Sequence, residues 1–487
     1  MTDPGLPALD RLFARCAGAR GVLLAVSGGS DSTALALLYA AWAEAAPAAP
    51  PAVVASVDHG LRADAAGDVA AVAVLAARLG LPFRALRIDA PPPSGNLQAW
   101  ARERRYALLA EAARMANCDV VLTAHTLDDQ AETLLLRLAR GSGVRGLAAM
   151  APDAALDDGI RLVRPLLGIA RATLREALLR RGIGWRDDPS NTDPRYARVR
   201  LRALMPQLAA EGLDAPRLAA TAAQLGRAAA AIDWAVGRLA GEAARVDPGG
   251  FVRLAPDVVA AAPAEIRLRL LSELIRWVGG GRYGPSLEAL AALDAELDAE
   301  MPARSLGGTL TFGVAGAVVI AREPGRDGLP AVELPPGATV TWDRRIRFRR
   351  TADDTGRITI APASRPALAG LARSGRTAAP LDRVLARMIA TVPAVWRDGR
   401  CLAIPALALW RDEAVRAAIH AEFRVAPPAP VVAGAGSCGE AAGGVAFATA
   451  GGGGERPSVN RSRATRPRGG RERLAASAVA PMFPYNI

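Results

Sequence analysis

A run of small and hydroxylated residues near the N-terminus carries the first chemistry that the sequence suggests. The run follows an apolar stretch at 21–26 and consists of Ser27, Gly28, Gly29, Ser30, Asp31 and Ser32. Paired glycines let a backbone turn tightly around a ligand, while serine hydroxyls and a following helix N-terminus offer donors to phosphate oxygens. The run therefore predicts a phosphate cradle that needs no lysine. A serine-rich helix cap is the alternative interpretation.

Asp31 lies inside this predicted cradle and has the same sign of charge as a phosphate. The two groups would repel each other unless a divalent cation lay between them. Mg²⁺ binds oxygen ligands and commonly joins one or two carboxylates to the phosphates of a substrate. We therefore expect Asp31 to be a ligand of Mg²⁺.

A second group of ionisable residues lies farther along the chain, where His125 precedes three carboxylates. Asp128 and Asp129 begin a helical pattern, and Glu132 follows one turn later. Apolar residues farther along this helix can face a core, which leaves the acids at its ligand end. Three carboxylates there could hold a metal or the ammonium group of a substrate. A solvated acidic helix start is the alternative.

The elements that must position these two groups alternate between short apolar runs and longer helical patterns. Strands are expected at 21–26, 52–57, 83–88 and 119–123, and helices at 33–42, 65–79, 97–116 and 127–140. Such alternation indicates a parallel sheet covered on both faces, whose ligands bind beyond the carboxyl ends of the strands. Both ionisable groups fall in strand-to-helix loops. The sequence therefore predicts an α/β fold with both groups at one edge of the sheet.

The composition excludes several classes of protein. All 60 basic residues are arginine, so a Walker A phosphate loop and a Schiff-base enzyme are excluded. The four cysteines lie far apart without a C-x-x-C pair, which argues against a zinc ribbon, an iron–sulfur site or a disulfide framework. A net charge of +12 is compatible with a polyanionic partner such as tRNA.

The sequence gives no sign of a membrane segment or an export signal. No apolar stretch reaches the roughly 20 residues that a spanning helix needs. Residues 1–4 do not begin a basic segment followed by an apolar one. We expect a cytoplasmic protein without a membrane partner.

Several motifs resemble those of a known family. S-G-G-x-D-S after a first strand is similar to the signature of the PP-loop ATP pyrophosphatases, which split ATP between the α and β phosphates. Within that superfamily the chain resembles the tRNA(Ile)-lysidine synthetases at V-D-H-G-L-R (57–62), A-R-E-R-R-Y (101–106), A-H-T-L-D-D-Q-A-E-T (124–133) and R-P-L-L (164–167). The family's usual pattern near 198–202 is R-N-x-I-R, and this chain has Val199 where the asparagine is expected.

The resemblance implies a domain organisation. A Rossmann-like PP-loop domain (adenine nucleotide alpha hydrolase-like) is expected over 1–207, a helical tRNA-binding domain over 208–304, and a smaller β-rich C-terminal region over 305–424. The last segment, 425–487, is rich in glycine, proline and arginine and lacks apolar periodicity. We expect that tail to be disordered.

The resemblance also implies a reaction that uses ATP, Mg²⁺, free L-lysine and an isoleucine tRNA with a CAU anticodon. O2 of the wobble cytidine would attack the α-phosphate and release pyrophosphate. The ε-amine of lysine would then attack C2 and expel AMP, which changes the codon that is read from AUG to AUA. The sequence leaves the assembly open, with a homodimer as one option.

Individual roles follow from the same resemblance. The run at 27–32 is expected to bind the phosphates of ATP. Three residues are expected near the nucleotide base: Val57, His59 and His125. The predicted catalytic residues are Asp31, Arg105, His125 and Asp129, of which Arg105 and His125 would stabilise phosphate charge. Two carboxylates are expected to bind the lysine: Asp129 and Glu132.

Two other functions remain to be weighed. A tRNA thiolase of the same superfamily would need a reactive or cluster-binding set of cysteines, which the isolated cysteines do not provide. A noncatalytic, arginine-rich RNA-binding protein on a decayed nucleotide-binding scaffold would bind RNA without ATP turnover. The intact glycine and acidic motifs count against that second alternative.

Overall fold

The computed structural model describes residues 5–58, 60, 65–89, 95, 97–157, 159–186, 193–281, 283–354, 356–372, 383–411, 413–423 and 432–433. His59, the segment 187–192 and most of the predicted disordered tail therefore lie outside the described residues. The described chain divides into two compact units, of which the first extends to residue 321 and the second contains 322–423 together with 247–251. The domain boundaries drawn from the sequence stay a prediction.

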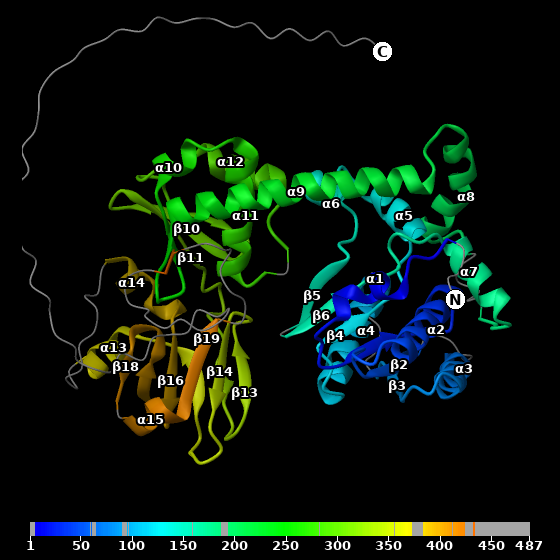
Figure 1. Ribbon diagram of the computed structural model, residues 1–487. Helices are drawn as coiled ribbons and strands as arrows, with labels where there is room; N and C mark the ends of the chain where they lie inside the picture. The colour runs from blue at the N-terminus through cyan, green and yellow to red at the C-terminus, as the bar shows by residue number, and fades with distance from the viewer. Residues whose placement is uncertain are drawn as a thin grey trace, which may run out of the picture. The chain divides into compact units, whose positions relative to one another are not determined.

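A six-stranded sheet forms the N-terminal part of the first unit (Figure 1), in the order β3-β2-β1-β4-β6-β5. Its strands are β1 (Val22–Ala25), β2 (Ala52–Asp58), β3 (Phe83–Arg87), β4 (Val120–Leu122), β5 (Asp153–Asp157) and β6 (Ile160–Val163). All neighbouring strands are parallel except β5, which runs antiparallel to β6 at the edge. The predicted parallel α/β sheet is confirmed, and the antiparallel edge was not predicted.

Helices cover both faces of this sheet because successive strand residues point to opposite sides. Val22 and Leu24 enter a core beneath α1, α2, α3 and α7, whereas Leu23 enters a second core beneath α4. The helices of this part are α1 (Leu9–Phe13), α2 (Ser30–Ala45), α3 (Ala65–Arg78), α4 (Leu97–Met115), α5 (Leu127–Leu138), α6 (Val144–Leu147) and α7 (Arg171–Arg180). The central strands β1 and β4 are buried on both faces, which explains their continuous apolar runs, whereas the edge strands β3 and β5 are partly exposed.

The strand order reverses between β1 and β4. The chain builds β2 and β3 on one side of β1 and then crosses to β4 and β6 on the other. A crevice forms at such a switch point beyond the carboxyl ends of the two strands, and ligands bind there in open α/β sheets. The loops that follow β1 and β4 carry the two ionisable groups singled out from the sequence.

The first unit continues into helices and a second sheet. Its further helices are α8 (Ala197–Ala210), α9 (Ala215–Ala243), α10 (Pro256–Ala260), α11 (Ala264–Gly279) and α12 (Leu287–Ala295). The long α9, whose first turn is capped by Asp214, packs against α5 and α11. The second sheet includes β7 (Ala244–Val246), β8 (Val252–Leu254), β9 (Arg304–Leu306), β10 (Thr309–Val314) and β11 (Ala317–Arg322). Thus β7 and β8 lie within the stretch predicted as helical.

The second unit consists of two antiparallel sheets and short helices. One sheet has the order β12-β15-β16-β17-β18 and the other β13-β14-β19. The strands are β12 (Val332–Glu333), β13 (Thr339–Trp342), β14 (Ile346–Arg350), β15 (Thr359–Pro362), β16 (Pro393–Arg397), β17 (Arg400–Ile404), β18 (Leu409–Trp410) and β19 (Ile419–Phe423). The helices are α13 (Arg365–Ala372), α14 (Arg383–Met388) and α15 (Glu413–Ala418). The predicted β-rich character of this region is confirmed.

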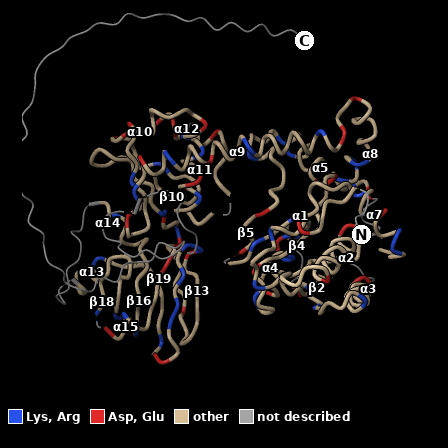
Figure 2. The backbone as a smooth tube through the Cα atoms, in the orientation of Figure 1, with Lys and Arg blue, Asp and Glu red and all other residues tan. Residues whose placement is uncertain are grey.

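Charged residues are spread along both units, as Figure 2 shows for arginine in blue and the acids in red. Within the described residues, no helix combines the length and the apolar character that crossing a membrane requires.

Candidate active site

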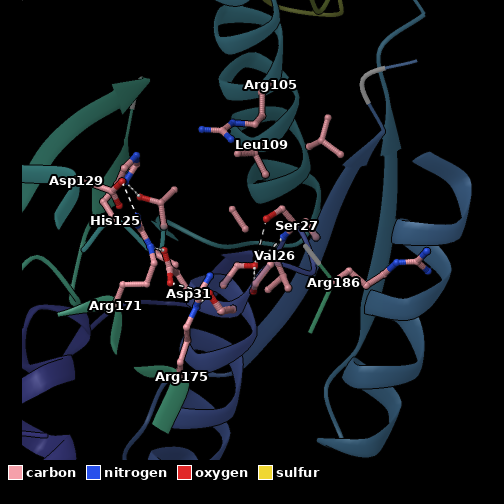
Figure 3. Close-up of a pocket in the computed structure, with 18 of the residues that line it drawn as sticks. Val26, Ser27, Asp31, Arg105, Leu109, His125, Asp129, Arg171, Arg175 and Arg186 are labelled. Carbon is pink, nitrogen blue, oxygen red and sulfur yellow. Dashed lines mark hydrogen bonds and ion pairs between the residues drawn. The ribbon is translucent and has the colours of Figure 1, made fainter. Parts of the chain in front are cut away.

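A cavity of about 720 Å³ opens at the switch point between β1 and β4 (Figure 3). Residues from the carboxyl ends of β1, β2 and β4 and from five helices, α2, α4, α5, α7 and α8 (Ala197–Ala210), line it. The lining includes Val26, Ser27, Gly29, Ser30, Asp31, Ser32, Val57, Arg105, Thr123, His125, Asp129, Arg171, Arg175, Arg186 and Arg202. The cavity therefore brings together the two groups that the sequence singled out.

The loop after β1 turns sharply and is held by its own serines. Gly28 has φ of +84°, a left-handed conformation that favours glycine. Ser32 closes the turn, because its hydroxyl accepts from the Ser27 backbone N–H at 3.1 Å and donates to the Gly29 carbonyl at 3.1 Å. The Ser32 hydroxyl thus shapes the loop, while the Ser27 hydroxyl lies 3.2 Å from it and the Ser30 hydroxyl donates to Asp31 Oδ1 at 3.1 Å.

The helix that follows directs its N-terminus into the cavity. Gly29 is the N-cap of α2, and no described side chain caps the first N–H groups of that helix. These groups also lack partners within the helix and carry the positive end of its dipole. Such an N-terminus is suited to an anion, so the local structure fits the predicted phosphate cradle.

Arg171 joins the two carboxylate-bearing loops across the cavity. Its Nε donates to Asp31 Oδ2 at 2.9 Å and its Nη2 to Asp129 Oδ1 at 3.1 Å, as the dashed lines in Figure 3 show. Its Nη1 lies 3.9 Å from Glu132 Oε1. Burial alone would lower the pKa of Arg171, but Asp129 and Asp31 raise it, so the guanidinium stays charged.

Arg202, from α8, completes this set. Its Nε donates to Glu132 Oε1 at 2.5 Å, and its Nη2 lies 3.7 Å from Asp129 Oδ1. We call Arg171 and Arg202 with Asp31, Asp129 and Glu132 the acid-paired cluster. The cluster holds three carboxylates and two guanidinium groups, and Arg105, Arg175 and Arg186 add positive charge to the same cavity.

Asp129 also holds the start of α5 in place. Its Oδ2 accepts from the Thr126 backbone N–H at 2.9 Å, and the Thr126 side chain accepts from the Asp129 N–H. This reciprocal arrangement is a capping box. Burial would raise the pKa of Asp129, but Arg171 and the hydrogen bond from Thr126 lower it overall. Asp129 is therefore ionised, and both of its oxygens are engaged.

Glu132 differs from Asp129 although it lies one turn away. Its side chain is only 2% exposed, and burial raises its pKa even though Arg202 acts in the opposite direction. A carboxylate with a raised pKa is a better proton acceptor. Glu132 does not line the cavity, and it reaches the site through Arg202 and Arg171.

His125 stands neutral beside these charges. Its pKa is lowered to about 3, mainly by burial and also by Arg164, Arg102 and Arg105, while Asp129 acts to raise it. Its Nδ1 lies 3.0 Å from the Thr123 hydroxyl. When Thr123 donates that hydrogen bond, Nε2 carries the ring proton and can donate to a ligand. His125 therefore offers a hydrogen bond rather than a positive charge.

The remaining arginines reach the cavity from different elements. Arg105 extends from α4 toward the cavity (Figure 3). Arg175 Nε donates to the Ser30 hydroxyl at 3.3 Å. Arg186 donates its backbone N–H to the Gly28 carbonyl at 3.0 Å and pairs with Asp68 at 2.9 Å. These contacts place positive charge around the phosphate loop.

Most of the residues chosen from the sequence meet at this cavity. Ser27, Gly29–Ser32, Val57, Arg105, His125 and Asp129 line it. Gly28 shapes the loop from behind, Glu132 lies in the layer beneath, and His59 lies outside the described residues. Sequence reasoning missed Arg171 and Arg175. Their spacing of four residues gave no signal among so many arginines.

Comparison with known proteins adds to this geometry. A family model described as a PP-loop domain matches residues 7–208. The tRNA(Ile)-lysidine synthase of Ruegeria pomeroyi is 41% identical over 391 residues, which cover 78% of this chain and 87% of that protein. The tRNA(Ile)-lysidine synthase of Bradyrhizobium diazoefficiens is 44% identical, and the match covers 65% of this chain and 93% of that protein. That of Rhodopseudomonas palustris is also 44% identical, and the match covers 67% of this chain and 94% of that protein.

Proposed function

The chain belongs to the tRNA(Ile)-lysidine synthase family, and on that premise we propose that its switch-point cavity uses ATP to join free L-lysine to the wobble cytidine of a CAU-anticodon isoleucine tRNA. The observation that carries this proposal is the shared cavity of the two loops. One loop is built for phosphate, and the other carries Asp129 and Glu132, two carboxylates that could bind an ammonium group. An ATP-dependent ligase for a cationic amino acid needs both features.

The phosphates of ATP would bind the turn that Gly28 shapes. The N–H groups at the start of α2 and the Ser27 and Ser30 hydroxyls would bind the phosphate oxygens. Arg105 and His125 would face the α-phosphate, where negative charge grows as cytidine O2 attacks and pyrophosphate leaves. Because His125 is neutral, its contribution would be a donated hydrogen bond, and Arg105 would supply the charge.

Mg²⁺ fits the Asp31 position. Magnesium sites that serve a nucleotide take one or two carboxylates from the protein and further oxygens from the phosphates. Asp31 offers one carboxylate at the loop, and no cluster of three or more metal-binding side chains exists among the described residues. Bound Mg²⁺ would neutralise charge on the departing pyrophosphate. Arg171 must give up part of its hold on Asp31, because its Nε lies 2.9 Å from Oδ2.

The lysine would enter the acid-paired cluster. Asp129 and Glu132 already bind guanidinium groups, so at least one of these ion pairs must open when the ammonium group arrives. The raised pKa of Glu132 suits it to take the proton that the amine must lose before it attacks C2. The wobble base would leave its stack to reach this position, as base-modifying enzymes commonly require.

The alternative functions are not favoured. Among the described residues, the free cysteines Cys16, Cys118 and Cys401 are buried, and none lines the cavity. Burial raises the pKa of Cys16 to about 12 and that of Cys401 to about 11, which disfavours the thiolate. Among the residues that the structure describes, thiolase chemistry therefore has no reactive thiol at this site. A tRNA substrate also supports a cytoplasmic location as part of the proposal.

The test is pyrophosphate release from ATP by the purified protein with CAU-anticodon isoleucine tRNA, with and without lysine. Release that depends on the tRNA is expected. Asp31→Ala should reduce the rate by about 100-fold or more, because a charge-stabilising group is lost from the transition state. Asp89→Ala, which removes an exposed carboxylate paired with Arg87, is the matched control and should act like the parent protein.

Two results would count against the proposal. Unchanged pyrophosphate release in Asp31→Ala would remove the phosphate loop from the chemistry. RNA binding with no ATP turnover in the parent protein would favour the noncatalytic alternative.

A further inference from the structure

A second group of guanidinium groups lies near His125 and has no role in the acid-paired cluster. We call Arg102, Arg105, Arg137 and Arg164 the arginine cluster. Arg102 and Arg105 lie over the ring of Tyr106, with their guanidinium carbons 5.0 and 5.2 Å from its centroid. The other two members bind neighbouring carbonyls of one loop, those of Ala149 and Ala151.

Besides the hydroxyl of Tyr106, the polar partners of this cluster within the described chain are carbonyl oxygens. Arg137 Nη1 donates to the carbonyls of Gly146 at 2.6 Å and Ala149 at 2.7 Å, and Arg164 Nη1 donates to that of Ala151 at 2.6 Å. No described carboxylate forms an ion pair with any of the four. Buried charges are normally paired, because removal from water costs several kcal/mol per ion. The cluster therefore has an excess of positive charge.

Two guanidinium nitrogens of the cluster, Arg105 Nε and Arg164 Nε, are buried and have no hydrogen-bond partner among the described residues. The hydroxyl of Tyr106 lies against the same two arginines and interacts with their side chains. Arg164 is itself only 8% exposed. Buried polar atoms nearly always have a partner, so two unpartnered nitrogens at one place indicate that a ligand or water completes the site.

The electrostatics of Tyr106 agree with this geometry. Burial alone would raise the pKa of the Tyr106 hydroxyl, but Arg102, Arg105 and Arg164 lower it overall. Burial also lowers the pKa of Arg164, and Arg102 and Arg137 lower it further while Tyr106 raises it. The hydroxyl thus lies in a positive field that an anion would neutralise.

We propose that the arginine cluster is a second phosphate site, distinct from the Ser27–Ser32 loop, in which Arg102, Arg105 and Arg164 bind phosphate oxygens and Tyr106 donates a hydrogen bond. Guanidinium groups bind phosphate in a bidentate manner, which suits a site built from arginine alone. Arg105 also lines the cavity, so the site opens toward the nucleotide and the RNA. The phosphate could come from the outer phosphates of the nucleotide or from a phosphodiester of the RNA.

The experiment compares binding to the full-length protein by titration calorimetry in two arms. The first arm titrates inorganic pyrophosphate. The second titrates a CAU anticodon stem-loop RNA in the presence of a non-hydrolysable ATP analogue. Arg102→Gln is the main variant because Arg102 is exposed and should not affect folding. Arg164→Gln is the second, and Arg104→Gln, exposed on the same helix, is the matched control.

For either source of phosphate, Arg102→Gln and Arg164→Gln should lose binding affinity, whereas the control Arg104→Gln should not. If the site holds nucleotide phosphates, Arg102→Gln and Arg164→Gln weaken pyrophosphate binding by about tenfold or more, as loss of a charge-assisted hydrogen bond implies, and leave RNA binding unchanged. If the site holds a phosphodiester of the RNA, the two variants weaken RNA binding by a similar factor. They also reduce the slope of the logarithm of the RNA affinity against the logarithm of the salt concentration by about one.

Affinities equal to those of Arg104→Gln in both arms would overturn the proposal. Arg102→Gln decides the matter should Arg164→Gln fail to fold. The result does not depend on lysine ligation, so a parent protein that forms no lysine adduct but still shows these losses would contradict only the proposed function.

Discussion

In the acid-paired cluster, Arg171 and Arg202 face three carboxylates, whereas the guanidinium groups of the arginine cluster face carbonyl oxygens and the ring of Tyr106. Both clusters lie near His125, and both contribute to the same end of the sheet. The first is nearly neutral within the fold, and the second is strongly positive. Removal of an arginine should therefore lower the free energy of unfolding in the acid-paired cluster, and leave it unchanged or raise it in the arginine cluster.

Arginine therefore has two different roles in the two clusters: it stabilises the fold in the first and can bind an anion in the second. A guanidinium paired with buried carboxylates fixes the relative positions of α2, α5, α7 and α8, so its loss weakens the fold. A guanidinium among like charges opposes folding and is compensated only when an anion binds. Stability measured without added ligand can thus assign each arginine to one use or the other.

The largest effect is expected for Arg171→Met. Its guanidinium is 19% exposed, and its removal would leave Asp31 and Asp129 without a main partner. Breaking a buried ion pair costs about 3–5 kcal/mol in the free energy of unfolding, which denaturant titration at pH 7 would measure. The loss should shrink at pH 5, because Asp129, whose pKa Arg171 no longer lowers, protonates more readily. A loss of unfolding free energy below about 0.5 kcal/mol, as is usual for surface substitutions, would contradict the claim that the acid-paired cluster stabilises the fold.

An intermediate effect is expected from the histidine between the clusters. The pKa of His125 is about 3 in the folded protein, below its ordinary value, so the unfolded chain binds more protons as the pH falls. Stability from the neutral ring is present above the ordinary pKa and is lost as the pH falls below it. Between pH 7 and 5 this amounts to about 2 kcal/mol.

His125→Gln should therefore show a smaller loss of unfolding free energy between pH 7 and 5 than the parent protein. His420→Gln, at an exposed position, is the matched control. Identical pH dependence in the parent and His125→Gln would mean that the positive surroundings do not hold the imidazole neutral.

The smallest effect is expected for Arg102→Gln without added phosphate, and its sign matters more than its size. Because Arg102 raises the electrostatic cost of Arg137 and Arg164, its removal should leave the unfolding free energy unchanged or increase it by under about 1 kcal/mol. Thermal unfolding in low salt would measure this change. A marked destabilisation would indicate that Arg102 has a structural partner. The arginines of both clusters would then stabilise the fold, and the distinction between them would be wrong.

The sequence predicted the two loops well because each is encoded over a few consecutive residues. The glycine turn at 27–32 and the capped acidic helix start at 126–132 are short patterns, and the alternation of strands and helices places both at one edge. This reasoning also gave the parallel sheet and the elements before residue 140 to within a few positions.

The partners of those loops could not be predicted in the same way. The contacts of Arg171 with Asp31 and Asp129 join residues 140 and 42 positions apart, and Arg202 lies 70 positions from Glu132. Only the folded chain shows that the expected lysine carboxylates are already paired. The sheet that links β8 with β11 was missed for a similar reason, because β7 and β8 are three-residue strands among helices.

The most direct test of the central claim is mass analysis of the wobble nucleoside after incubation of isoleucine tRNA with the protein, ATP and isotope-labelled lysine. The account predicts a cytidine that carries the labelled lysine, formed only with ATP and lost in Asp31→Ala. A wobble cytidine that stays unmodified while ATP is consumed, or that gains sulfur instead, would contradict it.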